Sequence, residues 1–166
     1  MTYLRNLHKL KVLSLTSTPI TDLGMESLKH SDSLEMLLIS NTRVGDEGLR
    51  HLNGLKNLNR LFLDKTQVGD AGLESLTDLP NLQCLFLTDA PVTSAGLRSL
   101  SRLPKLEQLY LDNTRVDNDG LEYLKSFPKL RAVSLTGPRV TRDAAETLAK
   151  ELPKVGVTYD HGNVTR

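Results

Sequence analysis

The chain has no tryptophan, and its single cysteine, Cys84, excludes a framework of internal disulfide bonds. A reducing, cytoplasmic setting fits this cysteine usage best. The formal net charge is only +1 at pH 7, so the sequence predicts no nucleic-acid or membrane partner. No run of about 18 apolar residues is present, so we expect no membrane span. Residues 1–9 do not contain the apolar core of a signal peptide.

What the chain does contain is a repeat of 24 residues that covers almost its whole length. Six copies start with leucine, at Leu10, Leu34, Leu58, Leu82, Leu106 and Leu130. If the positions of one copy are numbered as columns 1 to 24, columns 4, 6, 11 and 19 hold only Leu, Ile or Val. A fixed period in this range predicts a solenoid, in which each unit is stabilised by stacking on its neighbours.

Each unit is predicted to contain one short strand and one short helix. Columns 4 and 6 alternate with polar or variable neighbours, as in a strand, whereas columns 16 and 19 share one helix face. Column 13 holds good helix N-cap residues in five copies, namely Asp22, Asp46, Asp70, Ser94 and Asn118. In the sixth copy Arg142 breaks this column, and we expect Thr141 to cap the helix instead.

Column 15 is glycine in five copies, at Gly24, Gly48, Gly72, Gly96 and Gly120. A glycine inside a helix costs about 1 kcal/mol relative to alanine. We therefore expect a steric need, such as a close approach of neighbouring helices. The alternative is a short, frayed helix in which the glycine has no packing role.

The motif LxxLxLxxTxV, as in residues 58–68, resembles the leucine-rich repeat, and the continuation V-[TG]-D-x-G-L resembles the cysteine-containing subclass of F-box-type and bacterial proteins. The resemblance covers roughly residues 4–159. It implies a right-handed α/β solenoid, or horseshoe, with a parallel concave β-sheet and short convex helices. Column 9 departs from the family, because threonine stands where Asn or Cys is usual. A threonine hydroxyl can still bond the turn, whereas Ala90 and Pro138 cannot, so those two turns should be less well tied.

At 166 residues the chain has the length of a single domain. We expect a partial repeat over residues 1–9, then repeats over 10–33, 34–57, 58–81, 82–105, 106–129 and 130–154. Residues 155–166 should form a C-terminal strand, ending at Tyr159, and a tail. The polar tail, from Asp160 to Arg166, is expected to fray and to leave the sheet edge unattractive for pairing.

Columns 3, 5 and 7 face away from the predicted core, on the concave side of the sheet. Column 5 carries an apolar stripe, with a polar and acidic flank beside it in columns 7 and 8. An apolar centre with a polar rim is typical of a protein interface, and a partner with apolar anchors beside Lys or Arg would match it. The predicted partner-binding residues are Met36, Leu38, Arg60, Phe62, Asp64, Phe86, Asp89, Tyr110 and Asp112. The stripe could instead stabilise the sheet only, or mediate self-association.

The sequence offers no catalytic or metal-binding constellation. The four histidines share no column of the repeat, although metal ligands must converge on one point. Cys84 has no histidine in the strand columns beside it to act as a base. Asp64 and Asp112 lie two strands apart, so about 10 Å should separate their backbones. We predict no enzyme activity and no cofactor.

The favoured hypothesis is a non-catalytic protein–protein interaction module that binds a protein or peptide on its concave face. The family resemblance suggests a narrower alternative, the substrate-recognition part of an F-box-like ubiquitin ligase or a bacterial effector. That role needs an F-box-like segment before Met1, and the given chain has none. A third hypothesis is a recruiting domain of a larger enzyme.

Overall fold

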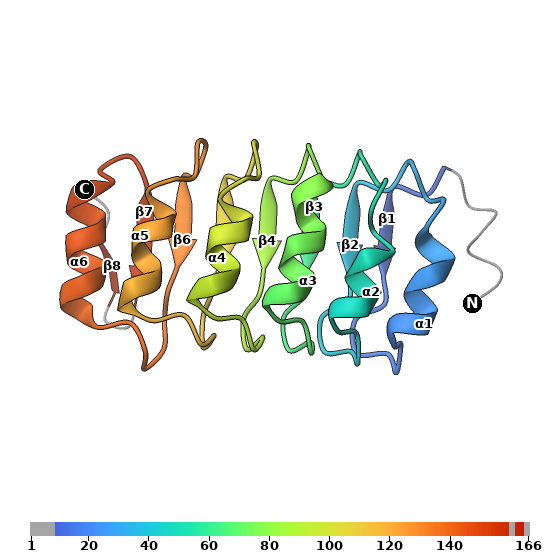
Figure 1. The fold of residues 1–166 in the computed structure, drawn as a ribbon, viewed down its shortest axis with the longest axis horizontal. Coiled ribbons are helices and arrows are strands. Elements are labelled where there is room, and N and C mark those ends of the chain that lie inside the picture. Colours follow the sequence, from blue (N-terminus) through green and yellow to red (C-terminus); the bar gives the residue numbers. More distant parts are fainter. Residues whose placement is uncertain (1–8, 160–161, 165–166) are drawn as a thin grey trace.

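The structure, a computed structural model, describes residues 9–159 and 162–164. It contains one eight-stranded sheet in which each strand pairs with the next along the chain (Figure 1). The strands are β1 (Val12–Ser14), β2 (Met36–Leu38), β3 (Arg60–Phe62), β4 (Cys84–Phe86), β5 (Gln108–Tyr110), β6 (Ala132–Ser134), β7 (Gly156–Tyr159) and β8 (Gly162–Val164). Strands β1 to β7 are parallel, and β8 is antiparallel to β7.

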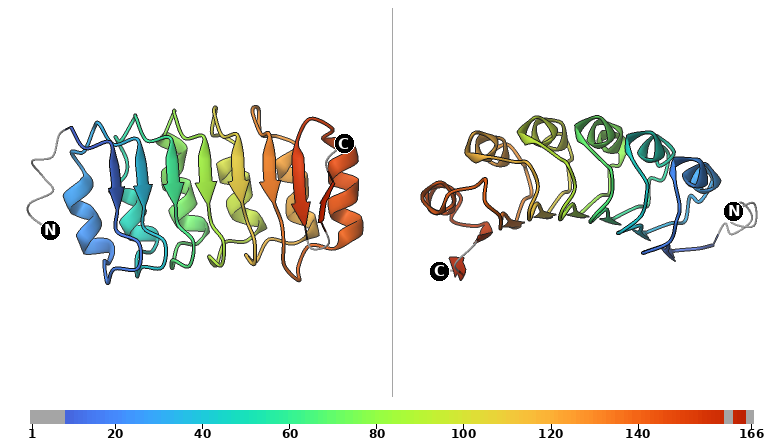
Figure 2. Two further views of the ribbon diagram at one scale, coloured as in Figure 1. Left: turned by 180° about the vertical axis from the view of Figure 1, so that it is seen from behind. Right: turned by 90° about the horizontal axis from the view of Figure 1, so that it is seen from below.

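Short helices return the chain from one strand to the next. They are α1 (Asp22–Met25), η2 (Glu26–Leu28), α2 (Asp46–Arg50), α3 (Asp70–Glu74), η3 (Ser75–Asp78), α4 (Ser94–Leu100), η4 (Asn118–Gly120), α5 (Leu121–Leu124) and α6 (Arg142–Glu151), where η marks a 3-10 helix. All α-helices lie on one side of the sheet, along the outer side of a shallow arc whose inner side is formed by the strands (Figure 2). The predicted fold class, an α/β leucine-rich-repeat solenoid, is confirmed.

The core is the stack of repeated leucines. Parallel pairing puts equal columns side by side, as in Leu37 beside Leu61 and Leu61 beside Leu85. These side chains are fully buried, as are Leu52 and Leu76 from the helix side. Because columns 4 and 6 point into this core, columns 3 and 5 must point out of the concave face.

The prediction that column 13 caps its own helix is wrong. The N-cap residues are those of column 12, and Asp22, Asp46 and Asp70 are the first helical residues. In the first five repeats the column 13 side chain instead accepts a hydrogen bond from the N-cap backbone N–H of the next repeat. The Asp46 Oδ1 to Gly69 N distance, for example, is 2.7 Å. In a capping box, a side chain of the same helix accepts from the N-cap N–H. Here the accepting side chain comes from the helix of the preceding repeat.

The steric need for glycine in column 15 is confirmed at Gly48, Gly72, Gly96 and Gly120. A Cβ atom built on Gly72 would lie 2.6 Å from the Asp46 Oδ1 atom and 3.1 Å from the Asp46 Cα atom. A Cβ atom on Gly48 would lie 2.5 Å from the Asp22 Oδ1 atom. The glycine therefore makes room for the column 13 carboxylate of the preceding repeat.

The threonines of column 9 tie the turns as predicted. The hydroxyls of Thr42, Thr66 and Thr114 are buried and donate to the carbonyl three residues earlier at 2.7 Å. Ala90 lacks this bond, although its backbone N–H still reaches the Leu87 carbonyl at 3.0 Å. The preceding column 8 is left-handed in the first five turns, with φ between 54° and 60° at Ser17, Asn41, Lys65, Asp89 and Asn113.

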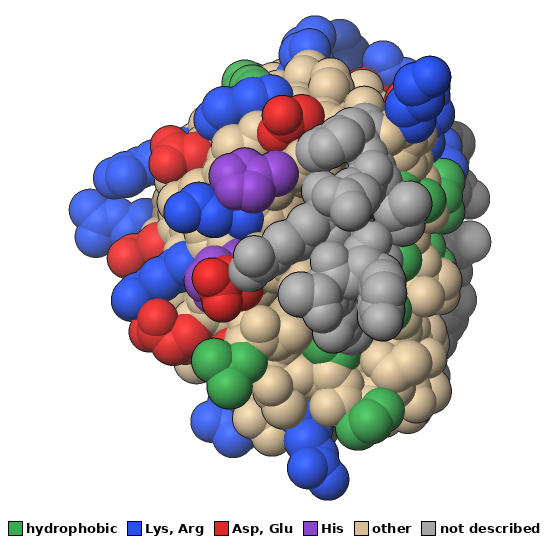
Figure 3. Space-filling model, turned by 90° about the vertical axis from the view of Figure 1, so that its right-hand side faces the viewer, with side chains coloured by type: hydrophobic (Ala, Val, Ile, Leu, Met, Phe, Trp, Pro, Cys, Tyr) green, Lys and Arg blue, Asp and Glu red, His purple; other side chains and the backbone are tan. Residues whose placement is uncertain are grey.

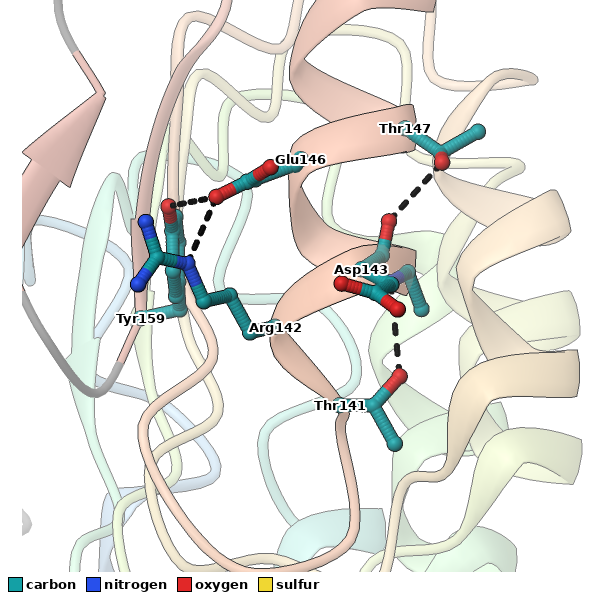
Figure 4. Close-up of polar contacts among 7 residues, drawn as sticks. Thr141, Arg142, Asp143, Glu146, Thr147 and Tyr159 are labelled. Atoms are coloured by element: carbon teal, nitrogen blue, oxygen red, sulfur yellow. Dashed lines mark hydrogen bonds and ion pairs between the residues drawn. The ribbon is translucent and has the colours of Figure 1, made fainter.

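Helix α6 is the last helix of the described residues. Thr141 caps it, as predicted, by accepting from the Ala144 N–H at 3.3 Å. Glu146 links the helix to β7, because it accepts from the Arg142 Nε atom at 2.7 Å and from the Tyr159 hydroxyl at 3.3 Å (Figure 4). This hydrogen bond from Arg142 is the main reason why the pKa of Glu146 is lowered.

The structure tests the predictions for the C-terminal end of the chain more than those for the N-terminal end. The final strand ending at Tyr159 is confirmed as β7. The predicted frayed tail is partly wrong, because Gly162–Val164 forms β8 on the edge of β7. Antiparallel pairing is made by backbone hydrogen bonds and does not require apolar side chains, so the hydrophobic pattern of the sequence did not predict this strand. Residues 1–8, which hold most of the predicted partial repeat, lie outside the described residues.

Candidate binding surface

The concave face carries the predicted apolar stripe as a continuous row. Leu38, Phe62, Phe86 and Tyr110 lie side by side on four neighbouring strands, and all four side chains are half-buried. The ring centroids of Phe62 and Phe86 are 4.2 Å apart, with an angle of 8° between the ring planes. Phe86 and Tyr110 stack at the same distance with an angle of 5°. We call these three rings the aromatic ladder.

Column 3 forms one flank of the aromatic ladder. Met36 and Cys84 are half-buried there, and Arg60 is exposed between them. The Cys84 thiol donates to the Gln108 Oε1 atom at 3.4 Å. Burial raises the pKa of this thiol, although the nearby Arg60 guanidinium opposes the shift. A raised pKa keeps the thiol protonated at neutral pH, which does not favour a nucleophile.

Two aspartates of the acidic flank, Asp64 and Asp112, accept hydrogen bonds from neighbouring repeats. Asp64 accepts from the Ser40 hydroxyl and from the Thr88 backbone N–H, both at 3.0 Å. Asp112 accepts from the Ser134 hydroxyl at 2.6 Å and from the Thr136 backbone N–H at 2.8 Å. Both carboxylates therefore join the ends of adjacent strands. The sequence held a signal for this, since each aspartate of column 7 is flanked in the same column by Ser or Thr.

Asp89 occupies the turn after β4 and is exposed, with a φ angle of 60°. Its carboxylate lies 4.0 Å from the Lys65 Nζ atom, a solvent-exposed pair of the kind that contributes about 1 kcal/mol or less. Among the predicted site residues, the structure thus brings together Met36, Leu38, Arg60, Phe62, Phe86 and Tyr110. Asp64, Asp89 and Asp112 lie along their border.

Comparison with known proteins identifies structures that share this fold. Residues 6–29 match the family model described as Leucine Rich repeat. No curated protein matches the chain. The crystal structure of internalin C2 (inlC2) from Listeria monocytogenes is similar to the chain with a TM-score of 0.71 and 22% sequence identity. The alignment covers 89% of this chain and 60% of that one.

A second structure, an internalin (inlF) from the same organism, has a TM-score of 0.72 and 23% identity, over 98% of this chain and 51% of the other. The chain folds as a leucine-rich-repeat protein. It spans only about half to three fifths of the length of these two structures. At such identities the comparison establishes the fold, and the subclass stays a prediction.

The outer, helix-bearing face of the leucine-rich-repeat solenoid differs from the concave face in the kinds of side chain that it exposes. Seen from the end where β1 lies, charged side chains of both signs gather on the helix side, and hydrophobic side chains show along the strand side (Figure 3). A groove of about 250 Å³ lies on the helix side between α5 and α6. Within it, Lys125 pairs with Glu122 at 2.6 Å and with Glu151 at 2.8 Å. No motif of the sequence pointed to this groove.

No group of three or more His, Cys, Asp or Glu side chains within residues 9–159 and 162–164 is placed to hold a metal ion. None of the helices described there is long and apolar enough to cross a bilayer.

Proposed function

We propose that the chain is a non-catalytic protein-interaction module whose concave face binds a protein or peptide partner. The aromatic ladder and Leu38 form the apolar centre of the proposed site, with Met36 and Arg60 beside it. Recognition of substrates within a ubiquitin ligase or a bacterial effector, and recruitment within a larger enzyme, would use the same face and extend this proposal.

The observation that carries the proposal is the position of the aromatic ladder. The fold is built from columns that point inward, such as Leu61 and Leu85, which are fully buried. Phe62, Phe86 and Tyr110 point the other way and remain partly open to solvent on three neighbouring strands. Aromatic side chains are enriched at the centres of protein interfaces, because each offers a large and rigid apolar contact area.

A competing explanation is that the aromatic ladder only stabilises the sheet. Stacked rings on adjacent strands contribute about 0.5–1.5 kcal/mol beyond the area that they bury. A binding role and a stabilising role therefore predict different consequences when the rings are removed, and the two can be separated on one set of variants.

The test compares Phe62→Ala/Phe86→Ala with Tyr123→Ala. Tyr123 is a half-buried aromatic residue of α5 on the outer face, so its truncation also destabilises the chain. Each variant is used to capture partners from host lysate at a temperature where its circular dichroism spectrum equals that of the wild type. We expect the double variant to lose the captured protein and Tyr123→Ala to retain it. Equal capture by all three chains would contradict the proposed site.

A further inference from the structure

The geometry of the proposed site restricts what it can bind, and this inference rests on the proposed function. Phe86 stacks on Phe62 on one side and on Tyr110 on the other, at 4.2 Å in both cases. Both faces of the central ring are therefore covered by its neighbours. What the aromatic ladder turns toward a partner is the row of ring edges, which carry the positive end of the ring quadrupole.

The two end rings also have neighbours in column 5. Phe62 lies beside Leu38 on the preceding strand β2, and Tyr110 lies beside Ser134 on the following strand β6. Ser134 is buried, and its hydroxyl donates to Asp112 at 2.6 Å. A cation–π contact requires a cation over a ring face. A lysine or arginine that approaches the ladder from above meets ring edges instead, which repel it.

Arg60 adds positive charge to the same surface. It is exposed, and it takes part in none of the ion pairs found among the described residues. Neighbouring charges on this side are paired, as in Lys11 with Glu35 at 2.8 Å and Arg131 with Glu107 at 3.6 Å. Arg60 precedes Phe62 by two residues on the same face of β3, so about 7 Å separates their backbones.

The acidic residues Asp64 and Asp112 lie across the aromatic ladder from Arg60, because they occupy column 7 and Arg60 occupies column 3. Asp64 accepts hydrogen bonds from the repeats on both sides of it, whereas Asp112 accepts hydrogen bonds from the repeat that follows it. The ring edges and the Arg60 guanidinium, which forms no ion pair within the residues that the structure describes, are thus the groups that a partner has to match. Electrostatic complementarity across an interface mainly sets specificity and association rate.

We propose that the site recognises a segment of another protein in which a carboxylate lies beside an aromatic or aliphatic side chain. The apolar side chain packs on the edges of Phe62 and Phe86, with an aromatic ring placed face-down in an edge-to-face contact. The carboxylate binds the Arg60 guanidinium, whose planar fork suits a two-point contact. This reverses the expectation from sequence that the partner offers Lys or Arg beside its anchors.

The experiment selects displayed random 12-residue peptides on the wild-type chain and measures the affinity of the selected peptides for variants. We expect enrichment of Asp or Glu within two residues of Phe, Tyr, Trp, Leu or Ile. Selected peptides should bind Arg60→Glu about three- to tenfold more weakly and lose binding to Phe62→Ala/Phe86→Ala. The matched control is Arg98→Glu, a charge reversal at an exposed arginine of α4, which should leave binding unchanged.

A charge-swap completes the test. A selected peptide in which the acidic residue is replaced by lysine should bind Arg60→Glu better than it binds the wild type. Peptides that depend on Phe62 and Phe86 but are enriched in Lys or Arg would overturn this inference and leave the proposed function intact. If none of the selected peptides depended on the two phenylalanines, the concave-face site itself would be refuted. The circular dichroism spectrum of Arg60→Glu confirms that any loss of binding occurs in a folded chain.

Discussion

At the scale of single residues, an aspartate and a glycine 26 positions apart act as one unit. The Asp46 carboxylate accepts from the Gly69 N–H, and it occupies the space that a side chain at Gly72 would need. The same relation joins Asp22 to Gly48 and Asp70 to Gly96. The bond offsets the cost of an unsatisfied N–H at a helix start, and the glycine permits the bond.

This pairing predicts the effect of Gly72→Ala. Helix propensity alone would make alanine more stable by about 1 kcal/mol. The new methyl group, however, would lie 2.6 Å from the Asp46 Oδ1 atom, and such overpacking costs about 1–3 kcal/mol. We therefore expect a lower free energy of unfolding for Gly72→Ala, measured by urea denaturation monitored with circular dichroism.

A double-mutant cycle provides the control. In an Asp46→Ala background the clashing oxygen is absent, so Gly72→Ala should cost at least about 1 kcal/mol less than in the wild type. The neighbouring Asp46 Cα atom, at 3.1 Å, leaves part of the penalty in place. A stabilising effect of Gly72→Ala alone would show that the glycine serves no steric purpose.

At the scale of elements, the helices are too short to be stable alone. Helix α1 has four residues, and α6, the longest, has ten. Isolated helices shorter than about 12–15 residues are marginal in water, so these depend on packing and on bonds between repeats. Within the described residues helix α6 is followed by β7 and β8, and Glu146 joins the helix to β7 through Tyr159.

This contact predicts a pH dependence of stability. The pKa of Glu146 is lowered in the folded chain, mainly by the hydrogen bond from Arg142. The ionised glutamate therefore adds stability above its unfolded pKa, about 4.3, and this stability is lost as the pH falls through the lower folded pKa. Between pH 6 and pH 3 we expect the melting temperature to fall less for Glu146→Gln than for the wild type. An equal fall in both chains would mean that Glu146 contributes nothing.

The sequence predicted the elements well, because each lies at a fixed place in the repeat. Columns 4 and 6 located the strands, and column 12 in the last repeat, Thr141, was correctly expected as a cap. The cap residues of the other repeats were placed one position too late, since an aspartate at a helix start suits both an N-cap and a first-turn position. Strand β8 was missed because its residues, Gly162–Val164, carry no alternating pattern.

At the scale of the whole molecule, the sequence predicted which side chains share the concave face but not how they interact. The fixed register puts Phe62, Phe86 and Tyr110 in one row. Their stacking depends on side-chain rotamers, which the repeat pattern does not specify. The bonds of Asp64 and Asp112 depend on hydroxyl groups of neighbouring strands in the same way.

The central claim is that the open side of the aromatic ladder contacts another protein. Replacing Phe86 by a photo-crosslinking phenylalanine analogue tests this directly, with the same analogue at Tyr123 on the outer face as the control. After irradiation in host lysate, we expect a discrete crosslinked protein from position 86 and none of that mass from position 123. No adduct at position 86, or the same adducts at both positions, would contradict the account.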